Sequence, residues 1–354
     1  MAGARGYSNY RGRGGKLKIF LAAVLVLVIA AACLVIFLQQ NIVYDESGRP
    51  KIVLPWQSEP PEDPPPAEAS DPEQEIELIV QEPEAPPRSL TLSAGDAPLT
   101  MEAWAAWLDG TQNLECTAVA LTLKDAAGKI YFDAAHAISG AVQTQSDTAA
   151  ALGAAAAYEG LTVTARFSCL HDARAANSNV RAMGLRNTGG YIFYDGNNSQ
   201  WLDPSKPAAR EYLCGLAAEI AALGVDEILL TDLSYPTVGK INKIDYNGDG
   251  PIEENLALLL REMRTALEPF GTVLSVELPE SVVSQGFDEV SGQRMSVIAP
   301  LVDRVYAVTA ADRAESLSAA VAAVSESTLF VPELPNGTDY EALSGHLLIL
   351  PAEG

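Results

Sequence analysis

The chain has 354 residues, of which 48% are hydrophobic and 19% are charged, so it is too apolar to be disordered as a whole. Lysine and arginine total 23 against 46 aspartate and glutamate residues, which gives a formal net charge of -23. Such a surface repels phosphate backbones, and this excludes a nucleic-acid-binding protein. The cysteines show neither CxxC pairs nor metal-ligand spacing to a histidine, so we predict structural thiols at Cys33, Cys116, Cys169 and Cys214.

The amino-terminal residues predict a membrane anchor. Residues 1–18 form a basic head, and the first 44 residues hold five basic side chains and no acidic one. The run from Ile19 to Leu38 has 20 residues without a charge, enough for a transmembrane helix. A cleaved signal peptide is the alternative, although its apolar region is usually only about 7 to 15 residues. The positive-inside rule then predicts a single-pass protein of the cell membrane, with a cytoplasmic amino terminus and an extracellular barrel domain.

Residues 39–88 are predicted to form a disordered stalk. Between residues 45 and 88 lie 11 of the 22 prolines and 12 acidic residues, too polar a composition to build a core. The apolar stretch Ile76–Val80 interrupts this region, either as a short strand or as a surface that rests on the following domain.

From residue 89 to 354 the pattern is that of a single domain in which short β-branched runs alternate with Ala- and Leu-rich stretches. We predict strands at 116–123, 161–167, 225–232, 272–278, 302–308, 327–334 and 346–350. We predict helices near 146–158, 207–224, 251–267, 312–324 and 338–344, with a weaker helix before Pro300. This alternation indicates a parallel sheet, and the length is typical of one barrel.

The predicted fold class is therefore α/β, a (β/α)8 barrel of the TIM type. The stretch YIFY at 191–194 is assigned as the missing strand, in third place, and residues 99–110 as a substitute for the eighth outer helix. No GxGxxG or P-loop pattern is present, which argues against a nucleotide-binding open sheet.

Alternation of side chains along the strands predicts which groups face the barrel lumen. Apolar Val163 and Phe167 suit the helix layer, which turns Arg166 inward, and the same argument turns Glu277 inward near the top of its strand. Glu277 is the leading catalytic candidate, and the equal alternative is a structural ion pair with Arg166. Asp232 stands at a strand end but is predicted to face outward unless a bulge or loop redirects it.

One segment resembles a known family. The stretch 201–236, WLDPSKPAAREYLCGLAAEIAALGVDEILLTDLSYP, resembles the family named "putative glycosyl-hydrolase domain", TIM barrels of anchored bacterial proteins whose members show W-x-DP and LGFDEIQFDYVRFP. The matching residues are Trp201, Asp203, Pro204, Leu223, Gly224, Asp226, Glu227, Ile228 and Pro236. Weaker similarities at 117–133, 165–172 and 301–308 extend the resemblance over most of 115–310.

The resemblance implies a glycoside hydrolase, with substrate-binding positions at Lys124, Asp125, Arg166, Asp172, Trp201 and Asp203. Two motif acids are replaced, because Thr231 and Thr122 stand where the family has Asp, and Ser234 stands where it has Arg. Glycoside hydrolysis ordinarily needs two carboxyl groups, one as acid and one assisting attack. We pair Glu277 with Asp232 as catalytic residues, with Glu333 as the next choice, and assign sugar stacking or simple packing to Trp201 and Tyr235.

The segment from Asp245 to Glu253 resembles the start of a calcium loop. Oxygen-bearing side chains stand at positions 1, 3, 5 and 9, namely Asp245, Asn247, Asp249 and Glu253. Position 12 is Leu256 rather than Glu, so an ordinary turn is the alternative, and no cofactor is required for the predicted reaction.

Two functions fit these observations. The first is a membrane-anchored, exported glycoside-hydrolase-like barrel that acts on envelope or extracellular polysaccharide. The second is an inactive barrel that serves as a carbohydrate-binding or envelope-scaffold module. The resemblance favours the first, and the replaced acids favour the second.

Overall fold

The computed structural model describes residues 88–95, 98–111, 116–247 and 250–351, together with the backbone of 42–44 and 50–52. The chain divides into two units, Met1–Ile79 and Val80–Gly354. In the first unit β1 (Ile42–Tyr44) pairs antiparallel with β2 (Pro50–Ile52), so part of the predicted stalk contains a short ladder. The predicted basic head, transmembrane helix, Ile76–Val80 stretch and Cys33 lie outside the described residues.

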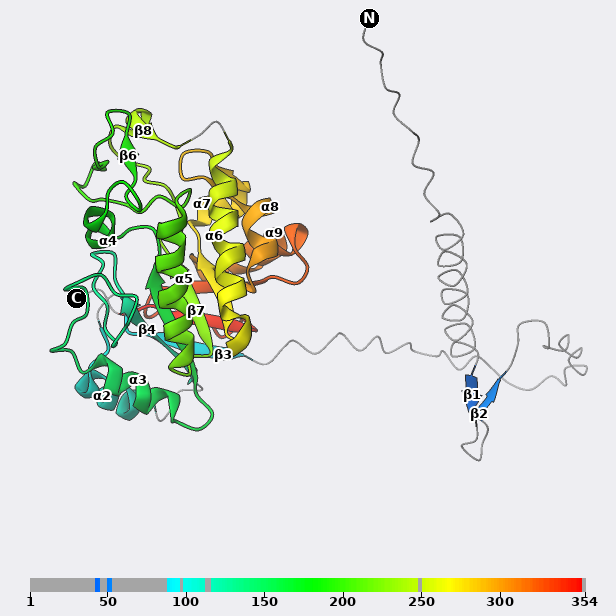
Figure 1. Cartoon of the computed structure of the whole chain (residues 1–354). Helices are drawn as coiled ribbons and strands as arrows, with labels where there is room; N and C mark the ends of the chain where they lie inside the picture. The colour runs from blue at the N-terminus through cyan, green and yellow to red at the C-terminus, as the bar shows by residue number, and fades with distance from the viewer. Residues whose placement is uncertain are drawn as a thin grey trace, which may run out of the picture. The chain divides into compact units, whose positions relative to one another are not determined.

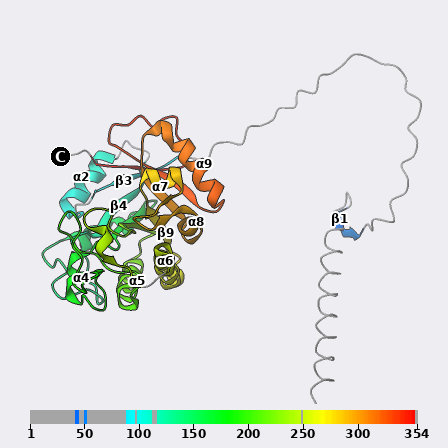
Figure 2. The ribbon, with the colours of Figure 1, turned by 90° about the horizontal axis from the view of Figure 1, so that it is seen from above.

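The second unit is a closed barrel of eight parallel strands, in the order β12-β13-β14-β3-β4-β5-β7-β9. This confirms the predicted α/β barrel. The strands are β3 (Ser89–Ser93), β4 (Cys116–Lys124), β5 (Thr162–Ser168), β7 (Glu227–Thr231), β9 (Val273–Glu277), β12 (Arg304–Val308), β13 (Leu329–Leu334) and β14 (His346–Ile349). Figures 1 and 2 show the helices on the outside of these strands.

The principal helices are α2 (Met101–Thr111), α3 (Thr148–Ala156), α5 (Pro207–Ala222), α6 (Ile252–Leu267) and α9 (Ala314–Val324). Shorter ones are α4 (Ala173–Ser178), α7 (Glu280–Gln285), α8 (Met295–Ile298) and the 3-10 turns η1 (Ile241–Lys243), η2 (Glu268–Phe270), η3 (Ala299–Leu301) and η4 (Ala311–Arg313). Two small antiparallel ladders lie in the connections: β6 (Arg186–Asn187) with β8 (Ile244–Asp245), and β10 (Phe287–Asp288) with β11 (Gln293–Arg294). None of the helices in the described residues is long and apolar enough to cross a bilayer.

Three sequence predictions about elements were wrong. The missing strand is β3, which closes the barrel between β14 and β4, whereas residues 191–194 lie in a loop where Ile192 forms one isolated bridge. Residues 101–111 form helix α2, which connects the barrel strands β3 and β4, and do not replace an eighth outer helix. Residues 338–344 contain turns rather than a helix.

The core has an outer ring and a lumen, which follow from the alternation of side chains along each strand. Phe167, Ile228 and Val276 pack in the outer ring against the helices. The outer helices contribute apolar faces at helical spacing, as with Leu256, Leu260 and Met263 of α6, each fully buried. Each such side chain stabilises the fold by about 1.5–3 kcal/mol.

The lumen is filled by a small apolar cluster comprising Ala120, Leu229, Tyr306, Val331 and Leu348. Beside this cluster lies the buried carboxylate of Glu227, which accepts hydrogen bonds from Arg304 Nη1 at 2.6 Å, Tyr306 Oη at 2.9 Å and Ser275 Oγ. A buried charge with this many donors is compensated, so Glu227 holds neighbouring strands together.

The cysteines of the described residues, Cys116, Cys169 and Cys214, are free thiols that are buried or half-buried. This agrees with the predicted structural role. Burial raises the pKa of the Cys214 thiol to about 12, which keeps it protonated and unreactive.

Candidate active site

An arginine between two glutamates lies at the carboxyl end of the barrel lumen. Arg166 on β5 donates from Nη2 to Glu277 Oε2 at 2.7 Å and from Nη1 to Glu333 Oε2 at 3.4 Å. Glu277 ends β9 and Glu333 lies on β13, so three strands supply the cluster. The inward orientations predicted for Arg166 and Glu277 are therefore confirmed.

The two glutamates of this cluster differ in exposure. The Glu277 side chain is 28% exposed, whereas that of Glu333 is 0% exposed. Burial, and then the charge of Glu277, raise the pKa of Glu333 to about 8 against the opposing effect of Arg166. One guanidinium cannot neutralise two neighbouring carboxylates, and the shorter bond goes to Glu277. The longer Arg166–Glu333 contact is thus mainly a hydrogen bond to a neutral acid at pH 7.

Asp232 lies directly after β7, and its side chain enters the barrel mouth in spite of the strand alternation. Its φ is 53°, a left-handed conformation that rotates the carboxyl group away from the helix layer. Asp232 Oδ2 accepts a hydrogen bond from Ser168 Oγ at 2.6 Å and from Thr231 Oγ1 at 3.4 Å. Strand alternation alone pointed Asp232 outward, and the named alternative, that the start of the loop redirects it, is what the structure shows, because β7 ends one residue before Asp232.

His171 is a mouth residue that the sequence reasoning did not identify. Its ring stacks on Trp201 with centroids 4.4 Å apart and planes at 4°. Nδ1 lies 3.9 Å from Asp232 Oδ1, and Nε2 shares a short hydrogen bond with Ser199 Oγ. The sequence could have indicated His171, because the chain has only three histidines and this one follows the end of the predicted strand 161–167.

A cavity of about 350 Å³ brings Asp232 and Glu277 together. Two more carboxyl groups line it, those of Glu280 and Asp288, together with the uncharged polar residues Ser234, Thr237, Ser291 and Gln293. Glu280 is already bound to Arg313 Nη2 at 2.9 Å and to Thr309 Oγ1 at 2.8 Å. Asp288 Oδ1 accepts from the Val290 amide at 2.9 Å. Asp232 and Glu277 are therefore the carboxyl groups best placed to meet a ligand there.

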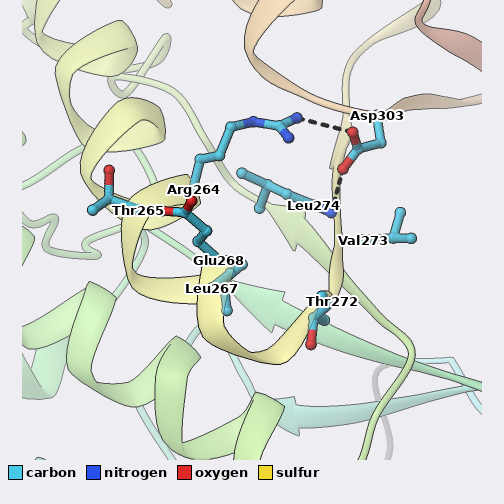
Figure 3. Close-up of a pocket in the computed structure, with 9 residues that line it drawn as sticks. Arg264, Thr265, Leu267, Glu268, Thr272, Val273, Leu274 and Asp303 are labelled. Carbon is cyan, nitrogen blue, oxygen red and sulfur yellow. Dashed lines mark hydrogen bonds and ion pairs between the residues drawn. The ribbon is translucent and has the colours of Figure 1, made fainter.

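A second hollow, of about 620 Å³, lies at the opposite end of the barrel, at the start of β9 (Figure 3). Its dominant contacts join Arg264 Nη2 to Asp303 Oδ1 at 3.0 Å and the Leu274 amide to Asp303 Oδ2 at 2.9 Å. In barrels of this type the amino-terminal face serves stability and the carboxyl ends carry the chemistry. We therefore assign this larger hollow a structural role.

Lys124 and Asp172 do not reach the surface. Lys124 Nζ lies 3.0 Å from Asp172 Oδ2, with both side chains 0% exposed. Asp172 also caps α4 through the Ala175 amide at 2.8 Å and accepts from Tyr212 Oη at 3.1 Å. Both side chains are occupied by each other and position the loop that carries His171, and the substrate contact implied for them stays a prediction.

Other implied substrate residues shape loops of the mouth. Asp125 accepts from the Lys129 amide at 2.8 Å and from Tyr131 Oη at 2.9 Å, which fixes its own turn. Trp201 is 8% exposed and donates from Nε1 to Asp195 Oδ2 at 3.0 Å. Asp125 and Trp201 therefore fix the conformations of loops around the site.

Asp203 and Tyr235 are likewise buried. Asp203 is 0% exposed and accepts from the Ser205 amide at 3.0 Å and Ser205 Oγ at 2.6 Å. Tyr235 is 1% exposed, packs edge-on against Tyr246 and accepts from Asn255 Nδ2 at 3.1 Å. Tyr235 makes the packing contacts that were named as its alternative role, and substrate contact by Asp203 and Tyr235 stays a prediction.

The described members of the predicted calcium loop have other partners. Asp245 Oδ2 lies 3.2 Å from Arg186 Nη2, and Glu253 Oε1 lies 3.1 Å from Arg294 Nε. Asn247 Nδ2 donates to Asp203 Oδ2, and Asp249 lies outside the described residues. Within the described part of the chain no three His, Cys, Asp or Glu side chains gather closely enough to hold a metal ion. Calcium binding stays a prediction.

Comparison with known proteins agrees with this architecture. A family model described as "Putative glycosyl hydrolase domain" matches residues 94–309, more than half of the chain. No curated protein sequence matches the chain significantly.

The chain is also similar, at low identity, to solved structures. The PgaB (BpsB) glycoside hydrolase domain from Bordetella bronchiseptica is 15% identical, with a TM-score of 0.50, and the match covers 71% of this chain and 84% of that one. A hypothetical protein from Ruminiclostridium thermocellum is 22% identical, with a TM-score of 0.44 over 53% of this chain and 96% of the other. A variant of the PelA glycoside hydrolase domain from Pseudomonas aeruginosa is 14% identical, with a TM-score of 0.39 over 71% and 84%.

Proposed function

Because the chain belongs to the family of "Putative glycosyl hydrolase domain" proteins, we propose that its barrel hydrolyses an envelope or extracellular polysaccharide at the cavity between Asp232 and Glu277. The observation that carries this proposal is the presence of two exposed carboxyl groups in one cavity at the carboxyl ends of the strands.

Arg166 holds the Glu277 carboxyl group in place at the cavity. The Arg166 Nη2 atom lies 2.7 Å from Glu277 Oε2. Glu277 then assists the attack on the anomeric carbon, as nucleophile or as base on a water. Glu333 touches no exposed surface and acts through Arg166, so it is a positioning residue.

Asp232 is assigned the second role, protonation of the leaving oxygen. Its side chain is 33% exposed in the same cavity, and Ser168 and His171 hold it in place from β5 and the following loop. His171 also lies near enough to exchange a proton with Asp232 through one water. Two carboxyl groups that face one cavity meet the minimum requirement of glycoside hydrolysis.

A non-catalytic carbohydrate-binding barrel is the second candidate function. It is favoured by the residues that replace the motif acid and arginine: Thr231 donates to Asp232 at 3.4 Å, and Ser234 lines the cavity. Neither the Thr231 nor the Ser234 hydroxyl can transfer a proton as a carboxyl group does. Hydrolysis therefore depends on Asp232 alone as the general acid.

We also propose that residues 19–38 anchor the protein in the cell membrane and that residues 39–88 hold the barrel on the extracellular side. The support is the length of the uncharged run and the basic residues on its amino-terminal side alone.

The decisive experiment uses the purified full chain in detergent on an envelope-glycan array, with reducing ends measured for every glycan that binds. Glu277→Gln should lower the release by at least about 100-fold without abolishing binding, because the amide keeps the shape and loses the charge. The control is Glu315→Gln, which removes an exposed carboxylate on α9. Binding without release in the unaltered protein would overturn hydrolysis and leave the sugar-binding function.

A further inference from the structure

A third cavity, of about 340 Å³, lies on the rim of the barrel mouth and is lined by side chains of two loops. Asn187, Thr188 and the stretch 192–194 come from the loop after β5, and Lys240 and Lys243 come from the loop after β7. The β6–β8 ladder joins the same two loops and lies at one end of the barrel in Figure 1.

The close approach of these loops is encoded by two glycines. Gly239 has a φ of +96°, and a Cβ at this position would lie 2.6 Å from the Gly196 nitrogen. The Gly196 amide donates to the Val238 carbonyl at 3.1 Å. This third cavity, called the rim cavity below, is therefore formed by two loops that are held together by backbone contacts.

The rim cavity carries positive charge on a strongly acidic protein. Lys240 and Lys243 are both exposed, and within the part of the chain that the structure describes neither forms an ion pair with a carboxylate. The formal charge of the whole chain is -23, and most of the other described basic side chains near the mouth are paired, as Arg166 and Arg186 are. Two unpaired ammonium groups facing one cavity fit an anionic ligand.

The same cavity has the surfaces that sugars use. Phe193 is 3% exposed and lines the cavity with an apolar side chain, and Tyr194, which is 50% exposed, lines it beside Phe193. An exposed aromatic ring offers an apolar face with a polar tip, and Asn187 and Thr188 offer hydrogen-bonding groups. The combination fits a sugar ring that carries an acidic substituent.

The distance from the catalytic cavity is short. Thr237 lines the cavity of Asp232 and Glu277, and Lys240 lines the rim cavity three residues later. Their Cα atoms are therefore at most about 11 Å apart. The loop after β7 thus lines both cavities, which supports one glycan chain reaching from one to the other.

We propose that the rim cavity is a subsite for an acidic sugar of the glycan substrate, with Lys240 and Lys243 binding the anionic group and Tyr194 contacting the ring. This rests on the proposed function, because it assumes that a glycan occupies the mouth. The catalytic cavity is lined by Asp232, Glu277, Glu280 and Asp288, and it repels anions. The favoured substrate is thus a chain in which a sugar without negative charge at the cleavage site is followed by an acidic sugar at the rim.

The experiment measures equilibrium binding with the full chain in detergent carrying Glu277→Gln, which prevents turnover. The probes are oligogalacturonate, its methyl ester as the uncharged match, dextran sulfate and plain dextran. We expect oligogalacturonate to bind at least about tenfold more tightly than its ester at low salt, and the preference to shrink as salt rises. Dextran sulfate bound more tightly than oligogalacturonate would identify the acidic group as a sulfate.

The test variant carries Lys240→Gln and Lys243→Gln together. The control is Lys129→Gln, which removes one exposed lysine elsewhere in the mouth loops. The double variant should lose about tenfold in affinity for the charged probe, which corresponds to about 1.4 kcal/mol and is within what two exposed charge pairs contribute together. It should keep its affinity for the ester, which carries no charge. Tyr194→Ala should weaken both probes.

Equal binding of the acid and the ester, or equal effects of the double variant and of Lys129→Gln, would overturn the subsite. Binding of the acid that depends on the two lysines, without reducing-end release by the unaltered protein, would support the subsite while hydrolysis fails. Cleavage of an acidic glycan at a rate that the double variant does not change would support hydrolysis and overturn the subsite.

Discussion

Asp232 combines a functional carboxyl group with an unfavourable backbone conformation. Asn tolerates the left-handed region nearly as well as Asp, whereas Ala does not. Asp232→Asn should therefore change the free energy of unfolding by less than about 0.5 kcal/mol, and Asp232→Ala should lower it by about 1–2 kcal/mol. Both variants should lose hydrolysis, since neither can supply a proton.

Urea unfolding and reducing-end release on the same preparations separate these effects. A fully active Asp232→Asn protein would remove Asp232 from the reaction. If Asp232→Asn and Asp232→Ala lowered the free energy of unfolding equally, the left-handed conformation of residue 232 would carry no extra free-energy cost for alanine.

Glu333 makes the stability of the protein depend on pH. Its pKa is raised from 4.5 to about 8 by burial and by Glu277, so the folded state holds a proton that the unfolded chain releases between these values. This contribution to the free energy of unfolding is fully present below about pH 4.5 and is lost as the pH rises toward about 8. The slope is at most about 1.4 kcal/mol per pH unit.

Glu333→Gln should remove this dependence, because the amide is neutral at every pH. The free energy of unfolding of the variant, measured by urea at about pH 5, 6.5 and 8, should gain on that of the unaltered protein as the pH rises. Glu315→Gln is the control, with an exposed carboxylate of α9. A constant difference across the pH range would contradict the raised pKa of Glu333.

At the scale of elements, replacing two glycines by alanine should change the free energy of unfolding in opposite directions. Gly153 is exposed within α3, and a Cβ there would meet no atom within 4 Å. Gly153→Ala should therefore raise the free energy of unfolding by about 0.5–1 kcal/mol. Gly128 has a φ of +75°, and a Cβ there would lie 2.1 Å from Asp172 Oδ1.

Gly128→Ala should lower the free energy of unfolding by about 2 kcal/mol or more, because it strains the backbone and displaces the buried Lys124–Asp172 pair. Thermal or urea denaturation of the two variants side by side tests both signs. A destabilised Gly153→Ala protein would mean that the exposed face of α3 is covered in solution.

At the scale of the whole molecule, the proposed anchor predicts a membrane-bound protein. Val28→Arg together with Leu34→Arg places two charges in the uncharged run, at a cost of about 2.5–3.5 kcal/mol each in a bilayer centre. The unaltered protein should stay in the membrane pellet after carbonate extraction, and the double variant should be released. Two arginines introduced at Ser58 and Ser70 of the predicted stalk serve as the control and should not cause release. Release of the unaltered protein would rule out an integral anchor.

The sequence alone determined the fold class, because seven predicted strands that alternate with helices in a single domain leave few alternatives to a parallel barrel. It also determined that Arg166 and Glu277 face the lumen, since side-chain alternation is a local property of each strand. Which segment closes the barrel was decided only in three dimensions. The run YIFY at 191–194 has the stronger strand composition, yet β3 pairs with β14 and β4, residues distant in the sequence.

The sequence named Glu277 and Asp232 as the catalytic pair, and only the tertiary structure decided how they meet and what surrounds them. Asp232 enters the mouth through a single left-handed residue, which strand alternation cannot anticipate. Lys124, Asp172 and Asp203 stand at strand or loop ends like exposed ligands, but their partners come from distant segments and bury them. His171 and the two rim lysines acquire a role through loops that meet across the mouth. Local periodicity fixes the direction of a side chain within an element, and contacts between elements fix what it meets.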